Sequence, residues 1–183
     1  MIYHKNDFIF TLNLFEDFFS QQRIQKSFQT IHKTSITGWE IWFQIEFATF
    51  LENKNSSVSE WYREWEYPID KRKSLKSKMF IDFLVRQKYA KKDAYIALEL
   101  KQNISAKTCI TNMIKDVNKV TSIRKSSSDI RSFWNIGIHK RISNNHFRDK
   151  EKIKEIVLEK FTTEDFFIES RYIKNTDFSY TIF

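Results

Sequence analysis

Glycine, cysteine and proline are scarce in this chain of 183 residues, which has two, one and one of them. A Rossmann fingerprint, a Walker loop and a G-x-S-x-G nucleophile elbow all need glycines at set spacings, so Gly38 and Gly137 alone exclude these motifs. The single cysteine, Cys109, excludes an intramolecular disulfide and any metal site built from several cysteines. We therefore expect a reducing, cytoplasmic setting.

Long apolar runs are also missing. No stretch approaches the ~18 consecutive apolar residues of a membrane span, and the first residues lack the pattern of a secretory signal, so we expect no membrane association. Aromatic residues, in contrast, make up 16% of the chain, which argues against disorder. Lys and Arg number 31 against 23 Asp and Glu, a net charge of +8. This charge predicts a polyanionic partner such as nucleic acid.

The length suits one domain, and we expect residues 1–183 to form it, with an N-terminal helical flank over 1–37, a core over about 38–140, and a helix and tail over 141–183. Apolar residues at helical spacing predict helices over Asp7–Ile31, Gly38–Leu51, Ala106–Arg124 and Lys150–Phe161. The helix over Gly38–Leu51 is apolar nearly all round, which predicts that it is buried.

Shorter alternating or apolar runs predict strands over Trp61–Ile69, Lys78–Arg86, Ala94–Lys101 and Phe133–Ile138. The tail Phe166–Phe183 alternates weakly and suggests an edge hairpin. The order of helix, three-stranded meander, helix and strand predicts an α/β fold with a mixed sheet flanked by helices.

Carboxylates occur in apolar surroundings at three places. Asp82 lies inside the apolar run of a predicted strand, where an ionised side chain is costly to desolvate. On the next strand Glu99 and Lys101 are two residues apart and so share one face. If these strands are neighbours, Asp82 and Glu99 converge, and a divalent cation best reconciles two carboxylates that close. Glu46 lies between apolar neighbours on the helix over Gly38–Leu51. The alternative is a structural network in which these acids pair with Lys or Arg.

The order of elements, together with IDFLV and ALELK, resembles the PD-(D/E)xK nuclease superfamily, whose fold is restriction-endonuclease-like. Asp82 matches the aspartate of the motif, and Glu99 and Lys101 match its Glu-x-Lys pair. Glu46, within GWEIWFQIEFATFL, matches the acidic residue of the first helix. The resemblance covers about residues 38–140. An isoleucine replaces the proline that names the motif, and the Gln-x-x-x-Tyr pattern of the exonuclease branch is missing.

The resemblance implies a Mg²⁺-dependent endonuclease that hydrolyses phosphodiester bonds of DNA in preference to RNA, with Mn²⁺ as a substitute ion. It implies that Asp82, Glu99 and the carbonyl of Leu100 hold the metal, and that Glu46 binds it directly or through water. Lys101 would orient the attacking water or neutralise charge on the phosphate. The catalytic residues implied are therefore Glu46, Asp82, Glu99 and Lys101.

Basic residues flank the Asp82 strand and follow the last core strand. We expect contacts with a phosphate backbone from Lys71, Arg72, Lys73, Lys76, Lys78, Lys140 and Arg141. A homodimer would pair two sites for double-strand cleavage. Two other functions stay open: an RNase or tRNA-cleaving toxin on the same scaffold, and a non-catalytic nuclease-like protein that binds nucleic acid or acts as an inhibitor or immunity protein.

Overall fold

The computed structural model describes residues 2–53, 57–69, 78–120, 129–159 and 167–183. Over these residues the helices are α1 (Ile2–Ser20), α2 (Gln22–Thr34), α3 (Glu40–Asn53), α4 (Ala106–Val120) and α5 (His146–Leu158). The strands are β1 (Val58–Pro68), β2 (Lys78–Gln87), β3 (Tyr95–Gln102), β4 (Ile130–Lys140), β5 (Glu169–Tyr172) and β6 (Phe178–Ile182). The predicted α/β class is therefore confirmed.

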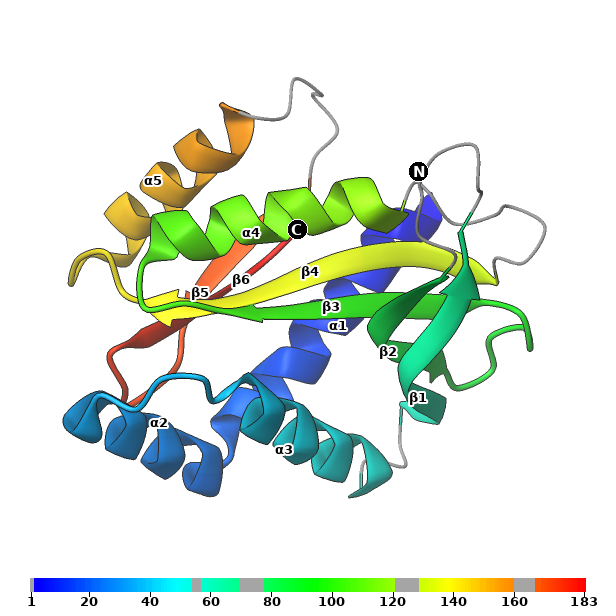
Figure 1. Ribbon diagram of the computed structural model, residues 1–183, viewed down its shortest axis with the longest axis horizontal. Helices are drawn as coiled ribbons and strands as arrows, with labels where there is room; N and C mark the ends of the chain where they lie inside the picture. The colour runs from blue at the N-terminus through cyan, green and yellow to red at the C-terminus, as the bar shows by residue number, and fades with distance from the viewer. Residues whose placement is uncertain (1, 54–56, 70–77, 121–128, 160–166) are drawn as a thin grey trace.

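The strands form one mixed sheet in the order β1-β2-β3-β4-β6-β5. The β3 and β4 strands are parallel, because α4 carries the chain back across the sheet between them, and the other neighbours are antiparallel. The α4 and α5 helices cover one face, and α1, α2 and α3 pack against the other (Figure 1). The central strands of the sheet thus lie between two helical layers, whereas much of the edge strand β1 is exposed.

The core between the sheet and the first three helices is rich in phenylalanine. Phe15, Phe18, Phe43 and Phe47 are all 0% exposed, and their rings pack with centroids 4.6–6.4 Å apart. A smaller apolar cluster fills the space under α4 and α5. The aromatic content of the sequence is therefore used mainly on one side of the sheet.

Two helices differ from the predictions. The segment Asp7–Ile31 is not one helix, because Gln21 has extended backbone angles (φ −67°, ψ 126°) and separates α1 from α2. The predicted all-round burial of α3 was wrong, since Ile41 and Ile45 are 65% and 55% exposed. Only the face of α3 that bears Phe43 and Phe47 packs into the core.

The C-terminal tail forms the predicted hairpin at one edge of the sheet. In it β5 pairs with β6, and β6 pairs with β4. Among the described residues, no helix combines the length and the apolar character needed to cross a membrane.

Candidate functional site

Asp82 and Glu99 lie where β2 and β3 part. The ladder between these strands runs from Val85↔Ile96 to Phe83↔Leu98, so the next facing position is Asp82 against Glu99. There the ladder stops, and Oδ2 of Asp82 accepts a hydrogen bond of 2.7 Å from the backbone N–H of Leu100. A strand residue directs its N–H and its C=O to the same edge, so the carbonyl of Leu100 also faces the Asp82 side.

Lys101 stands between two carboxylates on the α4 face of the sheet. Its Nζ is 3.4 Å from Oε1 of Glu99 and 3.0 Å from Oδ2 of Asp116 on α4. The Lys101 side chain is 22% exposed, and those of Glu99 and Asp116 are 10% and 4% exposed. Burial lowers the pKa of Lys101, but the negative charges of Glu99 and Asp116 outweigh it and hold the pKa above its ordinary value. Lys101 is therefore a fixed positive charge.

Gly137 explains how α4 brings Asp116 to this point. It is in register with Lys101 across the β3–β4 ladder. A Cβ atom at Gly137 would lie 2.2 Å from Sδ of Met113 and 2.9 Å from Sγ of Cys109, so α4 packs directly on the β4 backbone. Asp116 is one turn beyond Met113 and thus reaches across to β3. Sequence reasoning missed Asp116, although it sits on the apolar stripe of its helix.

Asp82, Glu99, Lys101 and Asp116 form a charged cluster, and the acid that α3 contributes to this cluster is Glu40. The structure does not bring Glu46 to the cluster. Burial raises the pKa of Glu40, Lys101 lowers it, and Asp82 and Asp116 raise it, so Glu40 is close enough to feel all three charges. Glu46 instead forms an ion pair with Arg23 on α2. Six residues separate the two glutamates, which turns Glu46 about 120° away around the helix. The signal for Glu40 was its spacing of three and seven residues from the buried phenylalanines of α3.

Glu64 on β1 adds a further carboxylate at the rim. In the β1–β2 register its position is opposite Asp82, between Arg63↔Phe83 and Trp65↔Ile81. Glu64 has a φ of 52°, which is rare for a non-glycine residue inside a strand. Its carboxylate is 57% exposed and pairs with Arg63 at 2.9 Å.

The pKa of Asp82 depends on most of the charged groups described above. Burial raises its pKa, the Leu100 N–H and Lys101 lower it, and Asp116 and Glu64 raise it, with a net value above the ordinary one. Negative charge thus accumulates around Lys101, which favours a further cation. Carboxylate and carbonyl oxygens are the donors that Mg²⁺ prefers. Within the described residues, however, no three His, Cys, Asp or Glu side chains are already arranged as a metal-binding group. The donor chemistry fits the ion, and the carboxylates would have to draw together around it.

The structure describes only some of the residues that are predicted to contact nucleic acid. Lys71, Arg72, Lys73 and Lys76 lie outside the described residues. Lys78 is exposed and pairs with Glu66 at 2.9 Å.

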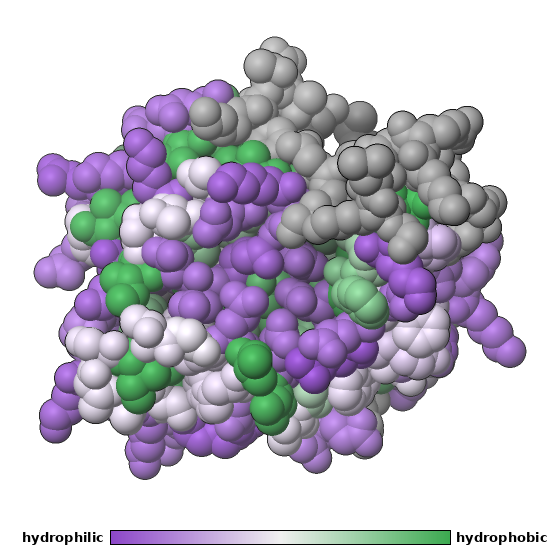
Figure 2. Space-filling model, in the orientation of Figure 1, coloured by the Kyte–Doolittle hydropathy of each residue, from purple (hydrophilic) through white to green (hydrophobic). Residues whose placement is uncertain are grey.

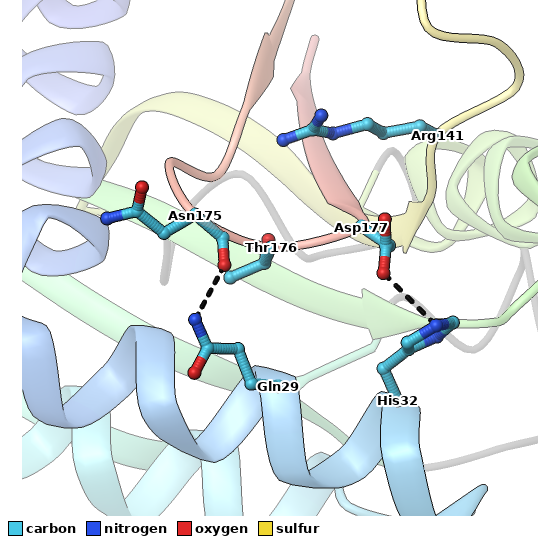
Figure 3. A pocket seen from close by; sticks show the side chains of 6 residues that line it. All are labelled: Gln29, His32, Arg141, Asn175, Thr176 and Asp177. Atoms are coloured by element: carbon cyan, nitrogen blue, oxygen red, sulfur yellow. Dashed lines mark hydrogen bonds and ion pairs between the residues drawn. The ribbon is translucent and has the colours of Figure 1, made fainter.

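Lys140 is the last residue of β4 and Arg141 follows it, and both line an opening of about 410 Å³ beside the start of α4. Arg141 also lines a polar pocket of about 360 Å³ together with Gln29, His32, Asn175, Thr176 and Asp177 (Figure 3). The guanidinium lies over the ring of Tyr172, 4.1 Å from its centroid, and donates to the carbonyl of Ile173 at 3.2 Å.

Hydrophilic residues also cover the centre of the face between α4 and α3 (Figure 2).

Comparisons of the chain with protein-family models, with curated proteins and with solved structures found no match. A function therefore has to rest on the residues and geometry of this chain.

Proposed function

We propose that this protein is a Mg²⁺-dependent nuclease with a restriction-endonuclease-like core, acting on DNA in preference to RNA. The observation that carries the proposal is the junction of Asp82, Glu99 and Lys101 at the point where β2 and β3 part. The order α3-β1-β2-β3-α4-β4 is the one that the resemblance implies. An acid from the first core helix also reaches the junction, although it is Glu40 in place of Glu46.

The metal ligands in this proposal are Asp82, Glu99 and the Leu100 carbonyl, with Glu40 binding directly or through water. A bound Mg²⁺ supplies polarisation of the scissile phosphate and a lower pKa for a water ligand. The Leu100 N–H holds one oxygen of Asp82, which leaves the other oxygen for the ion. A divalent cation would lower the repulsion between the carboxylates of Asp82 and Glu99.

Lys101 provides the positive charge for the reacting phosphate. Asp116 on α4 pairs with Nζ at 3.0 Å, closer than the 3.4 Å contact with the proposed metal ligand Glu99, so the ammonium is positioned mainly from the helix side. From there it can neutralise charge that develops on the phosphate oxygens or orient the attacking water. The close contact at Gly137 fixes this geometry, because it sets the distance between α4 and the sheet.

The basic end of β4 offers a path for the nucleic-acid backbone. Arg141 is four residues beyond Gly137, the residue in register with Lys101, which corresponds to about 13 Å along the strand. Its stacking on Tyr172 orders the guanidinium before any ligand arrives. A phosphate on one side of the scissile bond is therefore within reach of Lys140 and Arg141.

A cleavage panel tests the proposal. Plasmid, single-stranded DNA and RNA are incubated with the protein in Mg²⁺, Mn²⁺ or EDTA. We expect cleavage with either metal, none with EDTA, and loss of cleavage in Asp82→Asn and Glu99→Gln. Glu46→Gln is the matched control and should retain activity, because Glu46 pairs with Arg23 outside the cluster. Cleavage of RNA alone would indicate an RNase, and folded protein that cleaves none of the three would refute the nuclease proposal.

A further inference from the structure

Asn135 on β4 is the nearest neighbour of Glu99 across the parallel ladder. The two residues are in register. Trp134, Ile136 and Ile138 point into the core formed with the first three helices, so Asn135 projects from the opposite face, the α4 face, together with Glu99. On its other side, the Asn135 backbone exchanges hydrogen bonds of 2.8 and 3.2 Å with Phe183. The carboxamide therefore lies beside the acidic site and under α4.

The Asn135 carboxamide is completely buried and makes no hydrogen bond to any residue that the structure describes. Its residue is 0% exposed, and within the described part of the chain neither Oδ1 nor Nδ2 has a hydrogen-bond partner. Leaving such a buried group unsatisfied destabilises the folded state. An apolar residue would fill the same volume without that cost. The unpaired buried amide next to a carboxylate thus indicates that the site has a second state. In that state the amide donates a hydrogen bond.

We propose that Asn135 is a positioning residue for Glu99, in which Nδ2 donates a hydrogen bond to the Glu99 carboxylate, directly or through one buried water, when that carboxylate turns to bind a divalent cation. The inference rests on the proposed function. The present contact of Glu99 with Lys101 spans 3.4 Å, which is longer than a typical charge-assisted hydrogen bond. Carboxylates that ligate a metal are themselves hydrogen-bonded by neighbouring groups, which fix their orientation.

The chemistry of an amide suits this position better than that of a charged side chain. A lysine here would compete with the metal for Glu99, and an aspartate would add repulsion to a site already rich in negative charge. A neutral donor orients the carboxylate and leaves its charge available for the cation. Asp116 and Asn135 thus have separate tasks, since Asp116 holds Lys101 and Asn135 holds Glu99.

The test measures the melting temperature of Asn135→Leu, which has the same branching and the same number of non-hydrogen atoms as Asn, over a series of Mg²⁺ and Mn²⁺ concentrations. Without metal we expect no loss of melting temperature, because the substitution removes unsatisfied groups. The half-saturating metal concentration, obtained from how the shift depends on metal concentration, should rise about 10- to 100-fold. Ser179→Ala is the matched control, because the Ser179 hydroxyl on β6 is also buried and has no hydrogen-bond partner among the described residues. It should leave the metal response unchanged.

Three outcomes separate the two proposals. A normal metal response in Asn135→Leu would overturn the role of Asn135 while leaving the metal site intact. A wild-type protein that shows no metal-induced shift would overturn both. If Asn135→Leu fails to fold, Asn135→Ala replaces it, and the same rise in the half-saturating metal concentration is expected, with a lower melting temperature from the cavity. A normal response in Asn135→Ala would again refute the positioning role.

Discussion

Replacing Lys101 with alanine shows how the acidic cluster is held together without a bound ion. Nζ lies within 3.4 Å of Glu99 and 3.0 Å of Asp116, and both carboxylates are almost buried. The substitution removes the cation and leaves the carboxylates in place. The fold therefore has to keep negative charge in a region that water reaches poorly, and we expect a loss of stability.

The magnitude follows from the burial of the three groups. Breaking a fully buried ion pair by removing one partner costs about 3–5 kcal/mol. The Lys101 side chain is 22% exposed, so solvent screens part of the interaction. We therefore expect a loss of about 2–3 kcal/mol. A change of 1 kcal/mol shifts the melting temperature of a chain of this size by about 2–4 °C, which gives a decrease of about 4–12 °C.

The assay compares melting temperatures of wild type, Lys101→Ala and Lys107→Ala in EDTA and in saturating Mg²⁺. Lys107 is an exposed residue of α4, so its substitution removes the same charge without affecting the cluster. In Lys101→Ala, Mg²⁺ should produce a larger upward shift than in wild type, because the ion replaces the missing charge. An unchanged melting temperature in EDTA would refute the role of Lys101 in neutralising the acids. A loss that Mg²⁺ does not reduce would refute the cation site.

Other variants test the remaining parts of the site. Gly137→Ala should lower the free energy of unfolding by about 1–3 kcal/mol, because the added methyl group overpacks the contact with α4. Adding Met113→Ala to this variant should restore part of the melting temperature. An unchanged melting temperature in Gly137→Ala would contradict the close approach of α4. The pKa of Asp82 is raised by folding, so its ionisation opposes folding above that pKa and has no effect below its ordinary value of 3.8. Without metal, Asp82→Asn should melt above wild type at pH 7, and the difference should shrink as the pH falls toward 4; a constant difference would contradict the pKa shift. Neutralising Lys140 and Arg141 together should weaken nucleic-acid binding and flatten its dependence on salt, whereas an unchanged salt slope would place the backbone elsewhere.

The sequence predicts the positions on β2 and β3 well because a strand has a period of two. Alternation alone places Glu99 and Lys101 on one face. Asp82 is recognised because it is an isolated aspartate in an apolar run. Adjacent strands in a meander then bring Asp82 close to Glu99 and Lys101. These inferences need only local pattern and the pairing of neighbouring strands.

The residues that the sequence did not reveal depend on how helices rotate and how closely they pack. The α3 helix is apolar on almost every side, so its sequence does not show which glutamate faces the sheet. Packing exposes Ile41 and Ile45 and turns Glu40 inward. Asp116 reaches Lys101 only because α4 packs on the bare backbone of Gly137, and that distance is a property of the tertiary structure.

A titration with Mn²⁺, followed by the electron paramagnetic resonance signal of the free ion, tests most directly whether Asp82 and Glu99 hold a divalent cation. Mn²⁺ substitutes for Mg²⁺ at oxygen-rich sites and reports its own binding without a substrate. We expect wild-type protein to remove Mn²⁺ from solution in proportion to its concentration, and Asp82→Asn and Glu99→Gln to bind it much more weakly, while Glu46→Gln binds normally. Equal binding by wild type and the two cluster variants, or no binding by wild type, would contradict the metal site on which the proposed nuclease depends.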